Sequence, residues 1–254
     1  MTFTIAVAGK GGTGKTTIAA LLVRYLRESG RGTVLAIDAD PSSNLNQALG
    51  MPLVHSVGDI REEMLDKVGR NALEPGMAKQ DYLEYRIAES LVEGNGVDLL
   101  AMGRPEGPGC YCAANNMLRL SVDRLAKSYD FVVIDNEAGL EHLSRRTTRD
   151  VDVLLVVSDP TVRGLSAAAR VVGLVDELKT KVGRSYLVVN RANGALSAPL
   201  IAAIEGIKAE FLGTVPLDAG VAELDALGEP LVGIASDSPV YSAVKEIARR
   251  LVNR

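Results

Sequence analysis

The chain has 254 residues, which is long enough for one α/β domain with a full core and short for two independent domains. Hydrophobic residues make up 47% and charged residues 24%, and the formal net charge of -4 leaves no basic excess that would indicate a nucleic acid or an anionic membrane as partner. Tryptophan is absent and aromatic residues make up 4%, which argues against a surface that stacks nucleic-acid bases.

The start of the sequence carries no recognisable targeting signal. Residues 1–7 lack a basic region followed by a long apolar stretch, so we expect no signal peptide. The longest apolar runs, such as residues 151–157, are too short to span a bilayer and are interrupted by Asp152. Two cysteines in a chain of this size indicate a reducing compartment. We therefore predict a cytoplasmic protein with no nucleic-acid partner and no stable membrane binding.

Short apolar runs alternate with helical patterns along the chain. The runs are rich in valine, isoleucine and leucine and do not alternate with polar residues, which is typical of strands buried on both faces of a parallel sheet. Strands are predicted at residues 3–8, 33–37, 97–101, 131–134, 153–157, 186–189 and 211–215, and helices at residues 15–28, 117–128, 165–178 and 240–251. This alternation predicts a single α/β domain over residues 1–254, with a mostly parallel central sheet and helices on both faces.

One segment, residues 51–96, fits this alternation least well. It contains several helical stretches and no convincing strand. We predict that it is a helical excursion between the second and third predicted strands, inserted at the surface.

Residues 9–16, Gly-Lys-Gly-Gly-Thr-Gly-Lys-Thr, match the phosphate-binding pattern G-x-x-x-x-G-K-[ST] at every position. They follow a predicted strand and begin a predicted helix, which is the context of a P-loop NTPase. The glycines let backbone N–H groups converge on phosphate oxygens, and the helix N-terminus adds positive potential. Lys15 is expected to reach the β and γ phosphates, and the Thr16 hydroxyl to bind Mg²⁺. The predicted nucleotide contacts are Gly9, Lys10, Gly11, Gly12, Thr13, Gly14, Lys15, Thr16 and Thr17.

A second lysine inside this loop, Lys10, resembles the deviant P-loop of the MinD/ParA/nitrogenase-iron-protein class. The resemblance implies that Lys10 reaches across a homodimer interface to the partner's nucleotide and takes part in catalysis with Lys15. It also implies that Asp38 approaches Mg²⁺ through water and that Asp40 orients the attacking water. Asp135 would be the second carboxylate on the Mg²⁺ side. A lone aspartate after a strand is often a helix N-cap instead. Two aspartates at strand ends in a chain with a P-loop favour the role in the nucleotide site.

The base of the nucleotide can also be argued from the sequence. Guanine-specific P-loop proteins usually carry Asn-Lys-x-Asp after a late strand, and this chain has Asn-Arg-Ala-Asn at residues 190–193. The missing aspartate favours ATP and ADP. By resemblance, Asn190 reads the adenine amino group, with Arg191 and Pro216 as further contacts in a base pocket formed by residues 215–217.

Cys110 and Cys112 are the two cysteines of the chain and flank Tyr111 behind a Gly-Pro-Gly stretch. Three uses compete: packing as small apolar side chains, a strained and easily reduced disulfide, and metal binding. One Cys-x-Cys supplies two thiolates, whereas closed zinc sites generally have four ligands, and a two-fold dimer provides that number. Metal binding is favoured, with one soft metal ion such as zinc shared across the dimer.

The deviant P-loop, the Cys-Tyr-Cys element and the run Ala-Gly-Leu-Glu-His-Leu at residues 138–143 together resemble the CooC-type ATPases that mature nickel-containing carbon monoxide dehydrogenase. The resemblance covers most of the chain. It implies a homodimeric Mg-ATPase and metallochaperone that delivers nickel to apo carbon monoxide dehydrogenase or a related nickel enzyme. His55 and His142 could be further metal ligands, but a lone histidine is more often structural. The sequence assigns no role to Tyr111.

Two alternatives stay open. Residues 133–139, which include Asp135, resemble switch II of the MinD/ParA/nitrogenase-iron-protein class. An iron–sulfur reductase component is disfavoured, because nitrogenase iron proteins carry a second cluster cysteine just after switch II and this chain has none after Asp135. A spatial organiser of the MinD/ParA type would bind a membrane or DNA, and residues 240–251 are amphipathic, as a membrane anchor would be. We favour the interpretation of this stretch as the last helix to pack on the core.

Overall fold

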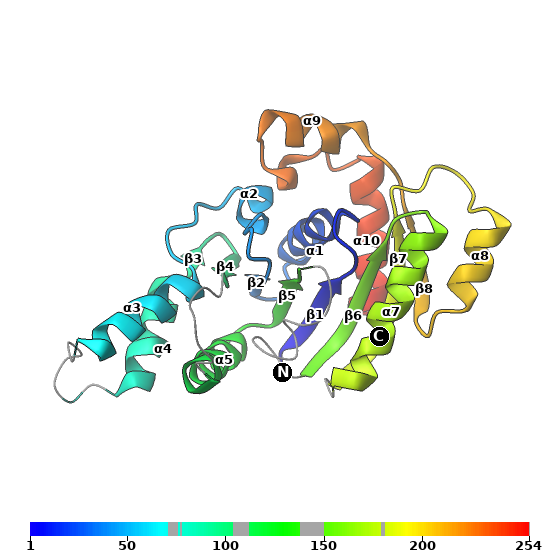
Figure 1. The fold of residues 1–254 in the computed structure, drawn as a ribbon. Coiled ribbons are helices and arrows are strands. Elements are labelled where there is room, and N and C mark those ends of the chain that lie inside the picture. Colours follow the sequence, from blue (N-terminus) through cyan, green and yellow to red (C-terminus); the bar gives the residue numbers. More distant parts are fainter. Residues whose placement is uncertain (71–75, 77, 104–111, 138–149, 179–180, 254) are drawn as a thin grey trace.

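The computed structural model describes residues 1–70, 76, 78–103, 112–137, 150–178 and 181–253. Within these residues, eight strands form one sheet with the order β3-β4-β2-β5-β1-β6-β7-β8 (Figure 1). The strands are β1 (Phe3–Ala8), β2 (Val34–Asp38), β3 (Val92–Glu93), β4 (Val97–Ala101), β5 (Phe131–Asp135), β6 (Asp150–Ser158), β7 (Lys181–Asn190) and β8 (Glu210–Val215). All neighbours pair in parallel except β3 and β4, which confirms the predicted single-domain α/β fold with a mostly parallel sheet.

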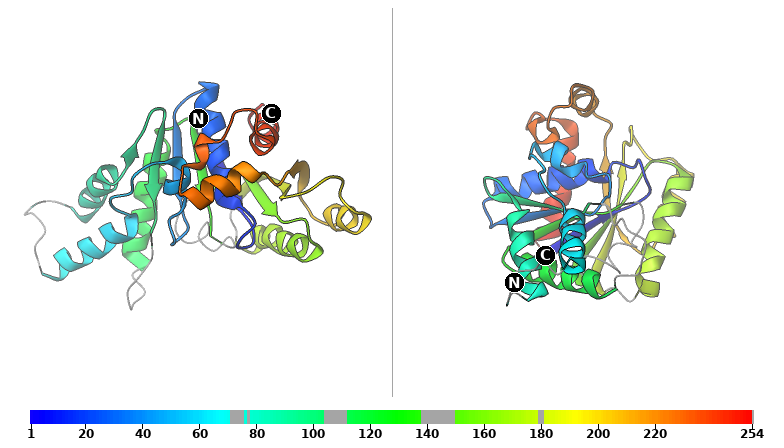
Figure 2. Two further views of the ribbon diagram at one scale, coloured as in Figure 1. Left: turned by 90° about the horizontal axis from the view of Figure 1, so that it is seen from above. Right: turned by 60° about the vertical axis from the view of Figure 1, so that its left-hand side comes forward.

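Helices cover both faces of the sheet. They are α1 (Lys15–Ser29), α2 (Leu45–Leu49), α3 (Val57–Gly69), α4 (Lys79–Glu89), α5 (Cys112–Ala126), α7 (Val162–Leu178), α8 (Ala198–Glu205), α9 (Ala219–Leu227) and α10 (Pro239–Val252). Residues of α1, α2 and α10 share one apolar cluster, whereas those of α3, α4, α5, α7 and α8 share the other (Figure 2). Alternate side chains of each strand enter opposite clusters, as Ile5 and Ala6 of β1 do, because successive side chains of a strand point to opposite faces.

Helix α1 sits at the centre of one face and begins directly after the glycine-rich loop. Its apolar side chains Ile18, Leu21, Leu22 and Leu26 are fully buried. It ends at Gly30, which has a left-handed φ of 62° and whose N–H donates to the carbonyl of Arg27. The burial of this helix against the sheet fixes its N-terminus at the carboxyl end of β1.

A partly buried polar cluster ties α1 to the C-terminal part of the chain. The guanidinium of Arg24 pairs with Glu28 at 2.7 Å, donates to Ser236 Oγ at 2.8 Å and lies 4.0 Å from the ring centre of Tyr241. The Tyr241 hydroxyl donates to Glu28. The apolar face of α10 is buried in the same cluster as α1, which confirms the prediction of a core-packing last helix.

The prediction for residues 51–96 needs two corrections. Strand β3 lies in this segment and pairs antiparallel with β4 at the edge of the sheet, so the segment does contain a strand. Helices α3 and α4 are not a surface insertion. Side chains of both helices lie in the core beneath the sheet: Val57, Ile60, Met64, Tyr82, Leu83 and Ile87.

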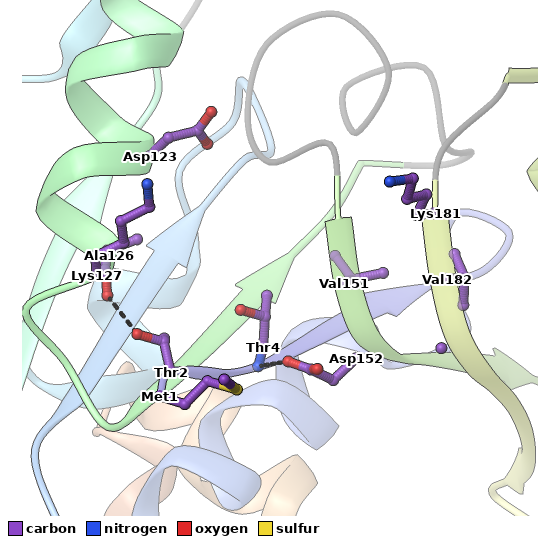
Figure 3. A pocket seen from close by; sticks show the side chains of 11 residues that line it. Met1, Thr2, Thr4, Asp123, Ala126, Lys127, Val151, Asp152, Lys181 and Val182 are labelled. Carbon is purple, nitrogen blue, oxygen red and sulfur yellow. Dashed lines mark hydrogen bonds between the residues drawn. The ribbon is translucent and has the colours of Figure 1, made fainter.

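A cavity of about 820 Å³ lies at the amino-terminal edge of the sheet, where β1, β6 and β7 begin (Figure 3). Met1, Thr4, Lys127, Val151 and Lys181 are among the described residues that line it. The Thr4 N–H donates to the Asp152 carboxylate at 2.7 Å on its floor. This cavity lies at the opposite end of the strands from the glycine-rich loop.

Candidate nucleotide-binding site

The predicted P-loop lies at the carboxyl end of β1, and its shape depends on glycine. A Cβ on Gly9 would lie 2.2 Å from the carbonyl oxygen of Val157, at the end of neighbouring β6. Gly12 and Gly14 have left-handed φ angles of 79° and 86°. Nothing lies within 4 Å of a Cβ built on Gly11 or Gly12. The loop is therefore tight against the sheet on one side and open on the other, as a phosphate cradle must be.

The N-terminus of α1 is arranged to receive an anion. Gly14 caps the helix without a side-chain hydrogen bond, and the first turn contains no acidic residue. The free N–H groups and the helix dipole therefore present positive potential to the loop. Lys15, the first helical residue, is buried with 8% of its surface exposed. A buried lysine beside the N–H groups of the first helical turn fits a ligand with several negative charges.

Two carboxylates face each other at the ends of adjacent strands beside this loop. Asp38 of β2 is in register with Asp135 of β5. Asp135 Oδ2 accepts a hydrogen bond of 2.6 Å from the Thr16 hydroxyl, whereas its buried Oδ1 has no hydrogen-bond partner. The Asp38 carboxylate accepts from the N–H groups of Asp40 at 3.0 Å and Leu45 at 2.9 Å. The strand pairing thus brings together residues nearly a hundred positions apart in the sequence.

The environment of these carboxylates favours a bound cation. The pKa of Asp135 is raised to about 7, chiefly by burial and also by the charge of Asp38, while the Thr16 hydrogen bond and Lys15 oppose the rise. Burial likewise raises the pKa of Asp38 to about 6, against the hydrogen bonds from Leu45 and Asp40. The donor set is carboxylate and hydroxyl oxygen, the kind that Mg²⁺ prefers. The Thr16 hydroxyl and the carboxylates of Asp135 and Asp38 therefore fit the predicted magnesium site.

Asp40 and Lys10 are the two other residues that the sequence predicted to act in catalysis beside Lys15. Asp40 is partly exposed, and its carboxylate accepts from the Ser42 N–H at 2.8 Å. Lys10 is exposed at the rim of a cleft of about 460 Å³ between the P-loop and α7. Both side chains are thus free to act on a ligand in the loop, and their catalytic roles stay predictions.

Asn190 and Arg191, at the end of β7, contact the P-loop directly. The Asn190 amide donates to the carbonyl of Thr13 at 2.8 Å, and the Arg191 guanidinium donates to the carbonyl of Gly12 at 3.0 Å. The next N–H, that of Ala192, donates to the carbonyl of Val215 and brings this loop beside Pro216. The sequence predicted these residues as nucleotide contacts but gave no sign of their bonds to the P-loop.

Asn136 was not predicted from the sequence. It is buried directly after Asp135, and its amide donates to the carbonyl of Val7 at 2.9 Å. This bond ties the end of β5 to β1 just before the P-loop. Its position after a predicted switch aspartate is the one sequence signal that could have drawn attention to it.

The predicted metal-binding cysteines fall largely outside the described residues. Cys112 is the first residue of α5, so this helix begins earlier than the predicted Met117. Cys110 and Tyr111 lie outside the described residues, as does His142, and His55 is exposed. Within the described part of the chain, no three histidine, cysteine, aspartate or glutamate side chains gather as a metal site would require.

Comparison with known proteins places this site in a family. The chain matches the CobQ/CobB/MinD/ParA nucleotide binding domain over residues 4–231. It is 46% identical to an uncharacterized ATP-binding protein of Methanocaldococcus jannaschii, over 98% of either chain. It is 33% identical to the carbon monoxide dehydrogenase accessory protein CooC of Rhodospirillum rubrum, over 88% of this chain and 87% of that one.

Solved structures agree with the sequence comparison. The MinD cell division protein of Aquifex aeolicus superposes with a TM-score of 0.71 at 25% identity, and the match covers 99% of this chain and 97% of that one. Because the match extends over nearly the whole of both chains, the two proteins share the whole fold and not one part of it. The predicted relation to the MinD/ParA class is confirmed, and the chain belongs to the CobQ/CobB/MinD/ParA family of nucleotide-binding proteins.

Proposed function

We propose that this protein is a Mg-dependent ATPase that dimerises around its nucleotide and delivers nickel to apo carbon monoxide dehydrogenase or a related nickel enzyme. One observation carries the proposal. A chain related to a carbon monoxide dehydrogenase accessory protein combines a P-loop containing a second lysine with its two cysteines placed as Cys-x-Cys. A nucleotide-driven interface and a pair of soft metal ligands are the two parts that a metal-delivering ATPase needs.

The ATPase half of the proposal assigns each residue a task in positioning and electrostatics. Lys15 and the free N–H groups of the loop hold the β and γ phosphates, and Asp40 holds the attacking water. Lys10 reaches the γ phosphate bound by the other protomer. Mg²⁺, when bound at Thr16, neutralises part of the phosphate charge. Asn190 and Pro216 would contact the adenine.

The metal half treats the nickel ion as cargo. Cys110 and Cys112 of two protomers would supply four thiolates, the ligand number of a closed soft-metal site. Cys112 is the first residue of α5, and the thiolate is the form in which a cysteine binds a metal ion. ATP binding closes the dimer and brings the four thiolates together, and hydrolysis loosens it and releases the ion. Zinc would compete, because thiolates alone do not select nickel.

Replacing Lys10 by alanine is expected to impair hydrolysis and ATP-dependent dimerisation while leaving nucleotide binding within about threefold of wild type. The reason is that Lys10 is exposed and acts on the partner's nucleotide, whereas Lys15 is buried in its own loop. Phosphate release, calorimetric ATP binding and light scattering measure the three properties separately. Wild-type hydrolysis by the variant would contradict a role in trans.

Replacing Cys110 or Cys112 by serine is expected to remove bound nickel while ATP affinity stays unchanged. A serine hydroxyl is not deprotonated near neutral pH and cannot replace a thiolate ligand. Metal analysis of the gel-filtered protein with Mg-ATP measures the loss. Cys112→Ala removes the same thiolate without adding a hydroxyl and is expected to lose nickel equally. Full nickel content in the double serine variant would overturn the site.

The MinD/ParA alternative predicts that the protein binds a membrane or DNA in place of nickel, and the same purified protein can be used to test it. A spatial organiser would co-sediment with anionic vesicles only when ATP is bound. The apolar face of α10 is buried in the core and is not available as an anchor in this conformation. None of the helices described is long and apolar enough to cross a bilayer. ATP-dependent co-sedimentation without bound nickel would favour the organiser over the metallochaperone.

A further inference from the structure

The loop that follows β7 holds two successive carbonyl groups of the P-loop. The Arg191 guanidinium donates to the Gly12 carbonyl at 3.0 Å, and the neighbouring Asn190 amide donates to the Thr13 carbonyl at 2.8 Å. Asn190 is buried with 3% of its surface exposed, whereas Arg191 is exposed. A Cβ on Gly14 would lie 2.3 Å from the Asn190 amide nitrogen. The P-loop is thus fitted closely to this pair.

The backbone of Arg191 adopts a conformation that its side chain does not favour. Its φ is 57°, in the left-handed region, and the Asn190 side chain accepts a bond of 2.9 Å from its N–H. Among the described residues other than glycine, only Ser43 shares a positive φ. Glycine would adopt this angle freely, so an arginine here meets a conformational cost that glycine does not. The hydrogen bond from the guanidinium to the Gly12 carbonyl is the interaction that arginine provides here and glycine cannot.

Holding a carbonyl also orients the N–H of the same peptide, because the two groups of a trans peptide point in opposite directions. With the Gly12 carbonyl bound to Arg191, the Thr13 N–H points inside the loop, where it makes only a long contact of 3.4 Å to the Lys10 carbonyl. The bond from Asn190 to the Thr13 carbonyl acts in the same way on the Gly14 N–H. A phosphate oxygen bound in the loop would accept from both N–H groups.

We propose that Arg191 is a positioning residue, which sets the affinity of the P-loop for phosphate by fixing the Gly12–Thr13 peptide and does not read the base. This role rests on the proposed nucleotide binding and replaces the direct nucleotide contact that the sequence suggested for Arg191. The residue acts on whatever occupies the loop, so its effect is the same for a ligand with or without adenine.

Calorimetric titration of wild type and three variants with Mg-ATP and with Mg-tripolyphosphate tests the proposal. Arg191→Ala is expected to weaken binding of both ligands by the same factor, about tenfold, the scale of one charge-assisted hydrogen bond. Arg191→Lys, which keeps a donor for the Gly12 carbonyl, is expected to lose less. Arg191→Gly is expected to lose as much as alanine while its Tm equals or exceeds that of wild type, because glycine relieves the backbone.

Salt titration separates positioning from a direct ion pair with phosphate. A guanidinium that pairs with phosphate makes binding more sensitive to salt, so the proposal predicts the same salt dependence for wild type and Arg191→Ala. A steeper dependence in wild type would overturn the positioning role. So would weaker binding of ATP with unchanged binding of tripolyphosphate, or wild-type affinity in Arg191→Gly. Failure of the wild type to bind either ligand would instead overturn the ATPase proposal, and this role with it.

Discussion

Replacing Lys15 by alanine is expected to abolish tight nucleotide binding. Lys15 is buried at the first turn of α1, where its charge acts on the Asp135 carboxyl. It is the one lysine expected to contact two phosphates of the bound nucleotide, and charge-assisted hydrogen bonds in a shielded site are the strong ones. Their loss corresponds to a fall in ATP affinity of about 100-fold or more.

Calorimetry with Mg-ATP measures this effect, and Lys127→Ala is a matched control. Lys127 is an exposed lysine that lines the cavity at the opposite end of the strands. The control is expected to bind ATP as wild type does. If Lys15→Ala kept an affinity within about threefold of the control, the assignment of residues 9–16 as the phosphate site would be wrong.

Replacing Asp40 by asparagine is expected to slow ATP hydrolysis about 100-fold while leaving Mg-ATP binding intact, the scale of losing one positioned catalytic group. The fold tolerates this change. Asp38 is held by the backbone N–H of Asp40, which the substitution does not touch, and the oxygen that accepts from Ser42 is retained in asparagine. The variant therefore removes a charge from the residue proposed to position the water and changes little else.

Single-turnover phosphate release with saturating Mg-ATP measures the rate, and Asp66→Asn is the control. Asp66 is an aspartate of α3 that pairs with Arg70 at the surface, away from the P-loop. It is expected to hydrolyse ATP at the wild-type rate. Near-normal turnover in Asp40→Asn would show that another group positions the water.

The central strands could be read from the sequence because strands buried on both faces are continuous apolar runs. The observed bounds of β1 and β4 are those predicted, β5 ends one residue later than predicted, and β2 begins and ends one residue later. Strands β6 and β7 extend further than predicted. Their amino-terminal parts are polar, and Asp152 is accommodated in β6 because its carboxylate accepts the Thr4 N–H.

The segment between β2 and β4 was the least predictable part of the fold. Strand β3 has two residues and pairs with Leu99 and Asp98 of β4, and so short an edge strand leaves no periodic pattern. Helix α3 does carry apolar residues at helical spacing, Val57, Ile60 and Met64. Its burial depends on the position of the sheet, which local sequence does not specify.

The phosphate loop was readable because its backbone geometry demands glycine at fixed positions. The pairing of Asp38 with Asp135 follows from the strand order, which the sequence did not state. The bonds from Asn190 and Arg191 to the loop cross more than 170 positions, and no local pattern signals such contacts. The Cys-x-Cys element was readable as a candidate ligand pair, but Cys110 lies outside the described residues.

The most direct test of the account is the nickel content and mass of one gel-filtered species of the wild-type protein with Mg-ATP. Light scattering with metal analysis across the same peak reports both quantities. The account predicts one nickel ion for every two chains, with binding that weakens as pH falls because thiol protons compete with the metal. Nickel at one ion per chain on a monomer, or an ATP-bound dimer that takes up no nickel, would contradict it.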